Sequence, residues 1–391
     1  MSDSLDTGRP WRRMLAPGGA SRRPSLGRLT PAMPVSVAII VVGFFVPSLI
    51  SSANGMTVMV NGMLLGLTAL SVGFLLNLLG WVSFGAAALS GGAAYLFSIL
   101  CVSENMNLTS AAVLAVVGSV VGGLLVGLVF VRSKALVFTM LTLAFGQLLY
   151  QVVTLDQFSS ATGGTNGLVV AYHGTFFGLS SAQLANPATI WPLIWVVVVI
   201  FVVGCNFMSR SRFGRVLRGI RENETRMQHS GYDTYLPKLA AFGIAGLIGA
   251  VAGVLSAVNV GFISPDLLTF EASGTAIIAA LIGGYQTAIG PVIGGLLVDW
   301  GQNEFGSTGH LYLYTGIAVI AVLVLFPRGL TGLAVDLWHG TTSQSRWPWR
   351  SARGQTPRDQ LPRDTVPPDD VSRDETGEDR RPAKGSAHAV D

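Results

Sequence analysis

The chain has 391 residues, of which 50% are hydrophobic and 12% are charged, against roughly 25% charged in soluble domains. Long apolar runs such as 194–203 do not alternate apolar and polar residues, which argues against an outer-membrane barrel. The apolar residues are concentrated in stretches long enough to cross about 30 Å of hydrocarbon as helices. The composition therefore excludes a soluble domain and predicts an all-α polytopic integral membrane protein.

The positive charge is distributed very unevenly along the chain. All 25 Lys and Arg fall in five blocks, with six in 9–28, two in 132–134, seven in 210–238, one at Arg328 and nine in 346–384. Charge at the centre of a spanning helix costs about 2.5–3.5 kcal/mol, and basic loops stay cytoplasmic. If every block is cytoplasmic, an even number of spans separates each block from the next. The electrostatic partner of these loops is then anionic lipid headgroup or nothing, and the charge does not indicate nucleic-acid binding.

Composition divides the chain into three parts. We expect 1–34 to be a disordered cytoplasmic leader, because it is polar and too long for the n-region of a signal peptide. Residues 35–333 form the transmembrane domain, and the polar segment 334–391 forms a disordered cytoplasmic tail. The predicted spans are 35–51, 56–76, 82–101, 110–131, 135–155, 188–208, 239–260, 271–283, 287–304 and 311–326.

These ten spans place both termini in the cytoplasm. The loops on the other side of the membrane, at 102–109, 156–187, 261–270 and 305–310, then contain no Lys or Arg. A single long span over 271–304 would reduce the count to nine and put the basic tail outside, which the positive-inside tendency disfavours.

Glycine is abundant inside the spans, with 48 in the whole chain. Small residues four apart let helix backbones approach closely. We expect this spacing to pack one compact bundle; it does not by itself indicate a homodimer. The pairs are Gly62/Gly66, Gly118/Gly122, Gly123/Gly127, Gly249/Gly253 and Gly290/Gly294.

The longest charged internal loop, 209–238, predicts a short amphipathic helix. Leu217, Ile220 and Met227 fall with Val216 roughly on one helical face. Gly231 is placed to end the helix at C′.

Charged residues occupy the other face of this predicted helix. Arg215, Arg218 and Arg221 lie on it, and Glu222 stands four residues before Arg226, a spacing that favours an ion pair. Two interpretations follow. The helix lies among lipid headgroups, or it is a docking surface for a soluble partner.

Other candidate residues carry weaker signals. Asp299 lies well inside a predicted span, which makes it a functional candidate, although it has no basic partner there. The segment TGGTNGL at 162–168 has the composition of a turn. His173 lacks the neighbours of a metal site, so we predict no metal. Cys101 and Cys205 are expected near opposite membrane faces as small packing residues.

The sequence predicts neither an enzyme nor an ATP site. The three lysines, Lys134, Lys238 and Lys384, follow Ser, Pro and Ala, so no phosphate-binding loop of the G-x-x-x-x-G-K-[ST] type exists. Nor does the sequence contain a convincing hydrolase triad or cofactor motif.

Several segments together resemble the LivM-type permeases of branched-chain amino acid ABC transporters, over about 56–333. The most specific is GRVLRGIRENETRMQHSGYDTYLPKLAAF at 214–242. FPRGLTGL at 326–333 is similar to the closing motif of the family. TGGTNGL and IGGYQTAIGPVIG at 282–294 match in character and order.

The resemblance implies a multi-pass subunit of the bacterial cytoplasmic (inner) membrane. Its expected partners are ABC ATPase subunits that bind the ATP, a second related permease and an extracytoplasmic substrate-binding protein. The implied ATPase-coupling residues are Arg215, Arg218, Ile220, Arg221, Glu222, Asn223, Glu224 and Gly231. Candidates for the translocation path or its outer loop are Gly163, Gly164, Thr165, Asn166 and Asp299.

Departures from the family pattern leave other substrates open. Ser83-Phe84-Gly85 runs into Ala86 where the family often has Ser-Leu-Gly-His, and Gln147 stands where a Glu is common. Tyr285-Gln286 replaces the usual Leu-Gly. A related permease for urea or short-chain amides is therefore an alternative. A secondary transporter, with intramembrane ionisable pairs or inverted broken helices, is the alternative of another class. A membrane enzyme or a purely structural assembly protein is a third.

Overall fold

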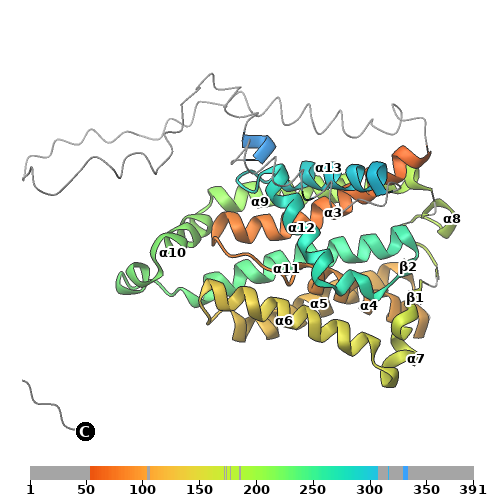
Figure 1. Cartoon of the computed structure of the whole chain (residues 1–391), viewed down its shortest axis with the longest axis horizontal. Coiled ribbons are helices and arrows are strands. Elements are labelled where there is room, and N and C mark those ends of the chain that lie inside the picture. Colours follow the sequence, from red (N-terminus) through yellow and green to blue (C-terminus); the bar gives the residue numbers. More distant parts are fainter. Residues whose placement is uncertain are drawn as a thin grey trace, which may run out of the picture. The chain divides into compact units, whose positions relative to one another are not determined.

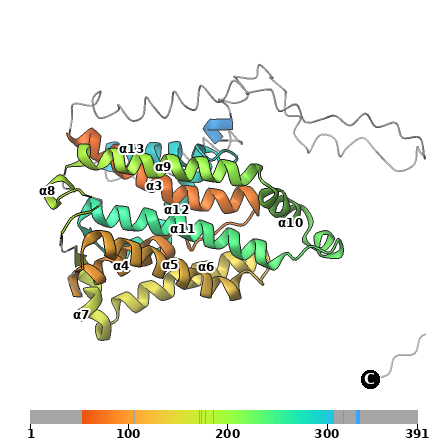
Figure 2. The ribbon, with the colours of Figure 1, turned by 180° about the vertical axis from the view of Figure 1, so that it is seen from behind.

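The computed structural model describes residues 53–103, 106–170, 172, 174–176, 178–184, 186–306, 316 and 329–332. The predicted leader and tail, the span at 35–51, all of the span at 311–326 except residue 316, and His173 and Arg328 lie outside this part of the chain. Figures 1 and 2 show the arrangement of the helices.

The described part is an all-α bundle. Its long helices are α3 (Ala53–Leu78), α4 (Ala86–Ser103), α5 (Leu108–Phe130), α6 (Ala135–Thr154), α9 (Pro187–Arg210), α10 (Arg212–His229), α11 (Tyr235–Val260), α12 (Phe270–Gly283) and α13 (Gly290–Phe305). Short elements connect them: η2 (Asp156–Phe158), α7 (Ser159–Thr162), η3 (Gly164–Asn166), β1 (Leu168–Val169), α8 (Ser181–Leu184), β2 (Phe262–Ile263) and η4 (Pro265–Leu268).

Every predicted span that falls within the described residues corresponds to a helix, which confirms the polytopic reading. One detail differs from the prediction. Residues 82–85 are not helical, so α4 starts four residues later than expected. The predicted division of 271–304 into two helices is confirmed, because Gly284 turns the chain with φ +99° between α12 and α13.

Five helices are long and apolar enough to cross a membrane: α3, α5, α6, α9 and α11. α4 and α12 are shorter apolar helices. In each of these helices we compare how much of an 18-residue apolar stretch is buried inside the protein. The buried share is 72% in α3 and in α11, against 17% in α5, 22% in α6 and 28% in α9. The first two are therefore the centre of the bundle, and the last three present apolar side chains at its surface.

Glycines bring the central helices into backbone contact. A Cβ added to Gly66 of α3 would lie 2.8 Å from the Cα of Val292 in α13. One added to Gly294 would lie 1.8 Å from the carbonyl oxygen of Ala279 in α12. The predicted intramolecular packing is confirmed at these positions. Gly122 of α5 has nothing within 4 Å of such a Cβ, so the predicted Gly118/Gly122 contact is not made there.

Hydrogen bonds join the connections at one end of the bundle. We call this end the α10 end. The Nη1 of Arg221 donates to the carbonyl oxygen of Asn77 (2.8 Å), and the Nδ2 of Asn77 donates to that of Gln286 (3.1 Å). The hydroxyl of Tyr235 donates to the carbonyl oxygen of Leu128 (2.8 Å). The connections after α3, α5, α10 and α12 therefore meet here.

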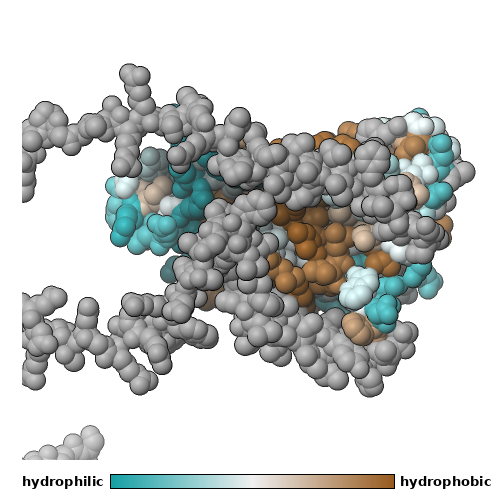
Figure 3. Space-filling view, turned by 90° about the horizontal axis from the view of Figure 1, so that it is seen from above, coloured by the Kyte–Doolittle hydropathy of each residue, from teal (hydrophilic) through white to brown (hydrophobic). Residues whose placement is uncertain are grey.

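The opposite end, the β end, gathers the remaining connections. β1 pairs antiparallel with β2, with Leu168 opposite Ile263. The hydroxyl of Thr109 donates to the carbonyl oxygen of Thr175 (2.9 Å). Within the described residues, Arg and Lys lie only at the α10 end: Arg132, Lys134, Arg210, Arg212, Arg215, Arg218, Arg221, Arg226 and Lys238. Figure 3 shows hydrophilic residues at the two ends and apolar ones between them.

Two similar non-helical segments follow α3 and α11, which run in opposite directions through the bundle. α3 and α11 each have 26 residues, and α3 ends at the α10 end whereas α11 begins there. Gly80-Trp81-Val82-Ser83 follows the first, and Gly261-Phe262-Ile263-Ser264 follows the second. Gly80 has φ +70° and Gly261 has φ +71°. Inverted pairs of broken helices are known from secondary transporters.

The two breaks meet inside the bundle. The hydroxyl of Ser273, on α12, donates to the carbonyl oxygen of Phe84. The Phe84 ring stacks on that of Phe270 with centroids 5.1 Å apart. The chain before α4 and the first turn of α12 are therefore in direct contact.

We predict that Gly294→Ala destabilises the bundle by about 1–3 kcal/mol, because the new methyl would overlap a backbone carbonyl that cannot move aside. Gly122→Ala is the matched control and should have little effect, since its Cβ meets open space. Thermal unfolding of the detergent-purified protein measures both. Equal melting temperatures for the two variants would contradict the packing argument.

Candidate functional site

α10 is built from two capped segments. The Oγ of Ser211 accepts a hydrogen bond from the N–H of Gly214 and caps the start. Asn223 has an extended backbone (φ −161°, ψ 99°) that interrupts the helix. Its Oδ1 accepts from the N–H of Arg226 (2.9 Å) and caps the second segment. Gly231 follows the helix with φ +81°, which confirms the predicted C′ position.

This break overturns one prediction. The proposed pairing of Glu222 with Arg226 needs a continuous helix turn, and the extended Asn223 lies between the two residues. Within the described part of the chain, the ion pair that α10 makes instead joins Glu224 to Lys238.

The apolar face of α10 is seated on the bundle. Leu217 is fully buried and Ile220 is 5% exposed, as the predicted amphipathic pattern requires. A Cβ on Gly214 would lie 2.5 Å from the carbonyl oxygen of Met208, so α10 begins in close contact with the end of α9. Leu217 and Ile220 therefore fix the helix and leave its charged face outward.

Two of the arginines hold α10 in place. The Nη2 of Arg218 donates to the carbonyl oxygen of Ser209 (2.5 Å). Arg221 donates to Asn77, and its side chain lies over Gly80, where a Cβ would be 3.1 Å from its Nε. Arg215 and Glu222 are exposed. Neither of them takes part in a hydrogen bond or ion pair found for Arg218 and Arg221, so both are available on the outer surface of α10 together with the exposed Arg212 and Arg226.

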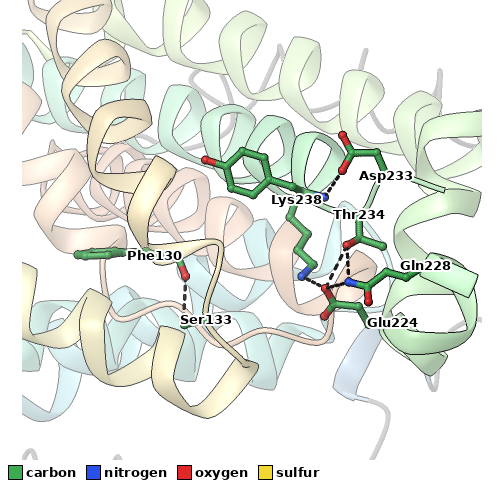
Figure 4. A network of polar contacts seen from close by, with 8 residues as sticks. Phe130, Ser133, Glu224, Gln228, Asp233, Thr234 and Lys238 are labelled. Atoms are coloured by element: carbon green, nitrogen blue, oxygen red, sulfur yellow. Dashed lines mark hydrogen bonds and ion pairs between the residues drawn. The ribbon is translucent and has the colours of Figure 1, made fainter. Parts of the chain in front are cut away.

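A partly buried network joins α10 to α11 (Figure 4). The Nζ of Lys238 is paired with the Oε1 of Glu224. The same oxygen accepts from the hydroxyl of Thr234 (3.1 Å) and the Nε2 of Gln228 (3.4 Å). Lys238 also lies over the ring of Trp81, 5.2 Å from its centroid, an arrangement that stabilises a cation further.

Trp81 connects this network to the long apolar helices through aromatic contacts. Its ring contacts that of Phe138 on α6, with centroids 4.7 Å apart. Phe138 in turn meets Phe242 on α11 edge to face, at 5.6 Å. The turn after α3, the start of α6 and the start of α11 therefore share one buried cluster with α10. Sequence reasoning missed Lys238 and Trp81 as site residues, although a Lys in the first turn of an apolar span was a usable signal.

The predicted outer-loop residues form a tight turn at the β end. Gly163 and Gly164 have φ +72° and +57°, and a Cβ on Gly163 would lie 1.9 Å from the carbonyl oxygen of Gly167. Thr165 and Asn166 are exposed at its tip. Nearby, burial raises the pKa of the Tyr172 hydroxyl, which donates to the carbonyl oxygen of Val258 (2.9 Å).

Asp299 lies elsewhere. It is half-buried on α13, whose neighbours are α3 and α12, and its Cβ would be 3.5 Å from one on Gly62. The loop of Gly163 and Gly164 instead contacts α6, α7 and η4. The structure does not bring these two groups of predicted residues together. Cys101 and Cys205 are both buried and free.

The fold defines a multi-pass helical membrane protein. A family model described as "Branched-chain amino acid transport system / permease component" matches residues 35–335. The chain belongs to this family of transport permeases.

Characterised relatives agree with this assignment. The chain is 24% identical over 287 residues to the high-affinity branched-chain amino acid transport permease LivM of Escherichia coli, covering 67% of this chain and 66% of that protein. It is 28% identical over 187 residues to LivH of Salmonella typhimurium, covering 46% and 60%. It is also 24% identical over 246 residues to the Escherichia coli ribose import permease RbsC, covering 61% and 73%. No solved structure matches the chain.

We predict that Glu224→Ala lowers stability by about 2 kcal/mol, because it leaves the buried Lys238 charge without its partner. The cost is below that of a fully buried pair, since the Glu224 side chain is 36% exposed. Glu222→Ala, an exposed neighbour, is the matched control and should change stability little. Thermal unfolding compares the two.

The double variant Glu224→Ala/Lys238→Met, compared with the two single variants, completes a double-mutant cycle. Removing both charges should recover part of the loss, because no unpaired cation remains in the interior. Strict additivity of the two single losses would contradict the pairing.

Proposed function

We propose that the chain is the transmembrane permease subunit of an ABC importer for branched-chain or other small, mostly apolar amino acids. Membership of the permease family over 35–335 is the observation that carries this proposal. The relatives LivM and LivH are named as branched-chain amino acid permeases, which favours this substrate class over the sugar named for RbsC.

The α10 end is proposed as the cytoplasmic end, because it holds the described Arg and Lys and basic loops stay on that side. Both termini are then cytoplasmic, and the protein lies in the bacterial cytoplasmic membrane. Substrate arrives at the β end from an external binding protein. A second related permease completes the membrane part.

ATP is proposed to be bound by separate ATPase subunits that dock on α10. This helix is firmly seated through Leu217 and Ile220, and it presents Arg215 and Glu222 outward. A rigid, charged projection at the cytoplasmic end suits a soluble partner better than it suits lipid alone. Ile220 and Glu224 support this projection from behind, so their role is in seating it.

The function is tested by uptake of labelled leucine in a strain that lacks this gene, with and without the gene restored. We expect restored, ATP-dependent uptake that excess isoleucine or valine abolishes. Competition by urea or short-chain amides instead would favour the alternative permease class. Uptake by this chain alone, without any ATPase, would favour a secondary transporter, since inverted broken helices occur in that class as well.

Docking gives a separate prediction. Arg215→Glu should lower co-purification of the ATPase by about tenfold or more, because a reversed charge at an interface meets like charge. Lys134→Glu, an exposed reversal in the turn before α6, is the matched control and should leave association intact. Both variants should remain in the membrane at normal levels. Full ATPase association by Arg215→Glu would assign α10 to the lipid surface instead.

A further inference from the structure

α6 carries exposed amides within its membrane span. Gln147 lies about 18 Å along this helix from Ala135, at 1.5 Å per residue, and so falls within a hydrocarbon layer about 30 Å thick. Gln147 and Gln151 are both exposed at the surface of the described bundle. Neither side-chain amide has a hydrogen-bond partner among the described residues. A polar group left unpaired in lipid costs several kcal/mol.

The amides belong to a polar edge of α6. By helical spacing, Gln147 lies on one side of the helix with Gln151, Tyr150 and Thr139, and the apolar Leu143 and Met140 lie among them. The opposite edge is apolar and includes Phe145 and Leu148. The amides and the Tyr150 hydroxyl are therefore confined to one side of α6.

Contacts show what each edge faces. The Phe145 ring lies edge to face with Phe130 of α5, with centroids 6.0 Å apart. On the polar side, the hydroxyl of Thr139 donates to the carbonyl oxygen of Val82 (2.9 Å). The polar edge therefore runs beside the broken segment that precedes α4.

The second broken segment completes the same face. A Cβ on Gly146 would lie 3.7 Å from the carbonyl oxygen of Leu268 in η4 and 3.9 Å from that of Phe84. Phe270, stacked on Phe84, is 56% exposed. Gly146, the residue before Gln147, therefore lies against the place where the inverted breaks meet, and the exposed aromatic pair lies at that same place.

We propose that the polar edge of α6 and the Phe84–Phe270 pair line the path along which substrate crosses the membrane. The second permease subunit closes this path on the open side, so that the amides face water and substrate in place of lipid. The amide of Gln147 is suited to the zwitterionic head of an amino acid and the two rings to its aliphatic side chain. This inference rests on the proposed function, whose substrate class it uses.

The test places single cysteines at two neighbouring positions in the complete transporter, with Cys101 and Cys205 replaced by Ala. Gln147→Cys should react with a small, charged methanethiosulfonate reagent, because a thiol ionises and reacts only where water reaches it. Leu148→Cys is the matched control. It is 56% exposed on the apolar edge and should stay unmodified in lipid. Saturating leucine should slow the reaction at position 147 by at least several-fold.

Equal reactivity at the two positions, or none at position 147 in a transporter that takes up leucine normally, would overturn the proposal. Failure of the proposed function looks different, because the unlabelled transporter would then not take up leucine at all. In that case protection of position 147 by another transported solute would still support the path and replace the substrate.

A second variant measures the contribution of the amide. Gln147→Leu should lower leucine uptake by about tenfold, the effect of losing one hydrogen bond of about 1.4 kcal/mol in the membrane. Leu148→Met should leave uptake unchanged. Normal uptake by Gln147→Leu would contradict a role of this amide in the path.

Discussion

A bare charge in hydrocarbon costs several kcal/mol, and the rest of this structure depends on how the chain avoids that cost. The described Arg and Lys residues gather at one end of the bundle. Lys238 is the exception in burial, at 3% exposed. It is tolerated because Glu224 pairs with it and Trp81 offers its ring face. The ion pair that compensates the burial of Lys238 therefore also holds α10 against the bundle.

The same contacts link the charged end to the interior. Arg221 holds the turn at Gly80, and Trp81 in that turn packs under Lys238. Three residues further on, the carbonyl of Phe84 accepts from Ser273 of α12. A contiguous series of packed groups therefore connects α10 with the place where the two broken helices meet. Packed side chains and hydrogen bonds of this kind can carry energetic coupling between distant sites when they include an element that has two arrangements.

Much of this fold could be predicted from the sequence, because hydrocarbon imposes long apolar helices and segregated charge. The helix at α10 and its end at Gly231 followed from local periodicity and glycine chemistry. The break at Asn223 did not, since an Asn serves equally well on the polar face of a continuous helix, and the Glu222–Arg226 pairing was wrong for that reason. The ion pair between Glu224 and Lys238 could not be predicted either, because it depends on how α10 packs against α11. The sequence contains a visible repeat, Gly80-Trp81-Val82-Ser83 and Gly261-Phe262-Ile263-Ser264. Only the structure shows that the two copies have opposite orientations in the bundle.

The central claim is that charge sorts the two ends of the bundle to opposite sides of the membrane. Labelling of intact cells with an impermeant thiol reagent tests it most directly, using chains whose buried Cys101 and Cys205 are replaced by Ala. The account predicts that Asn166→Cys, at the exposed tip of the β end, is labelled from outside. It predicts that Glu222→Cys, on the exposed face of α10, is labelled only after the cells are opened. Labelling of Glu222→Cys in intact cells would contradict the account.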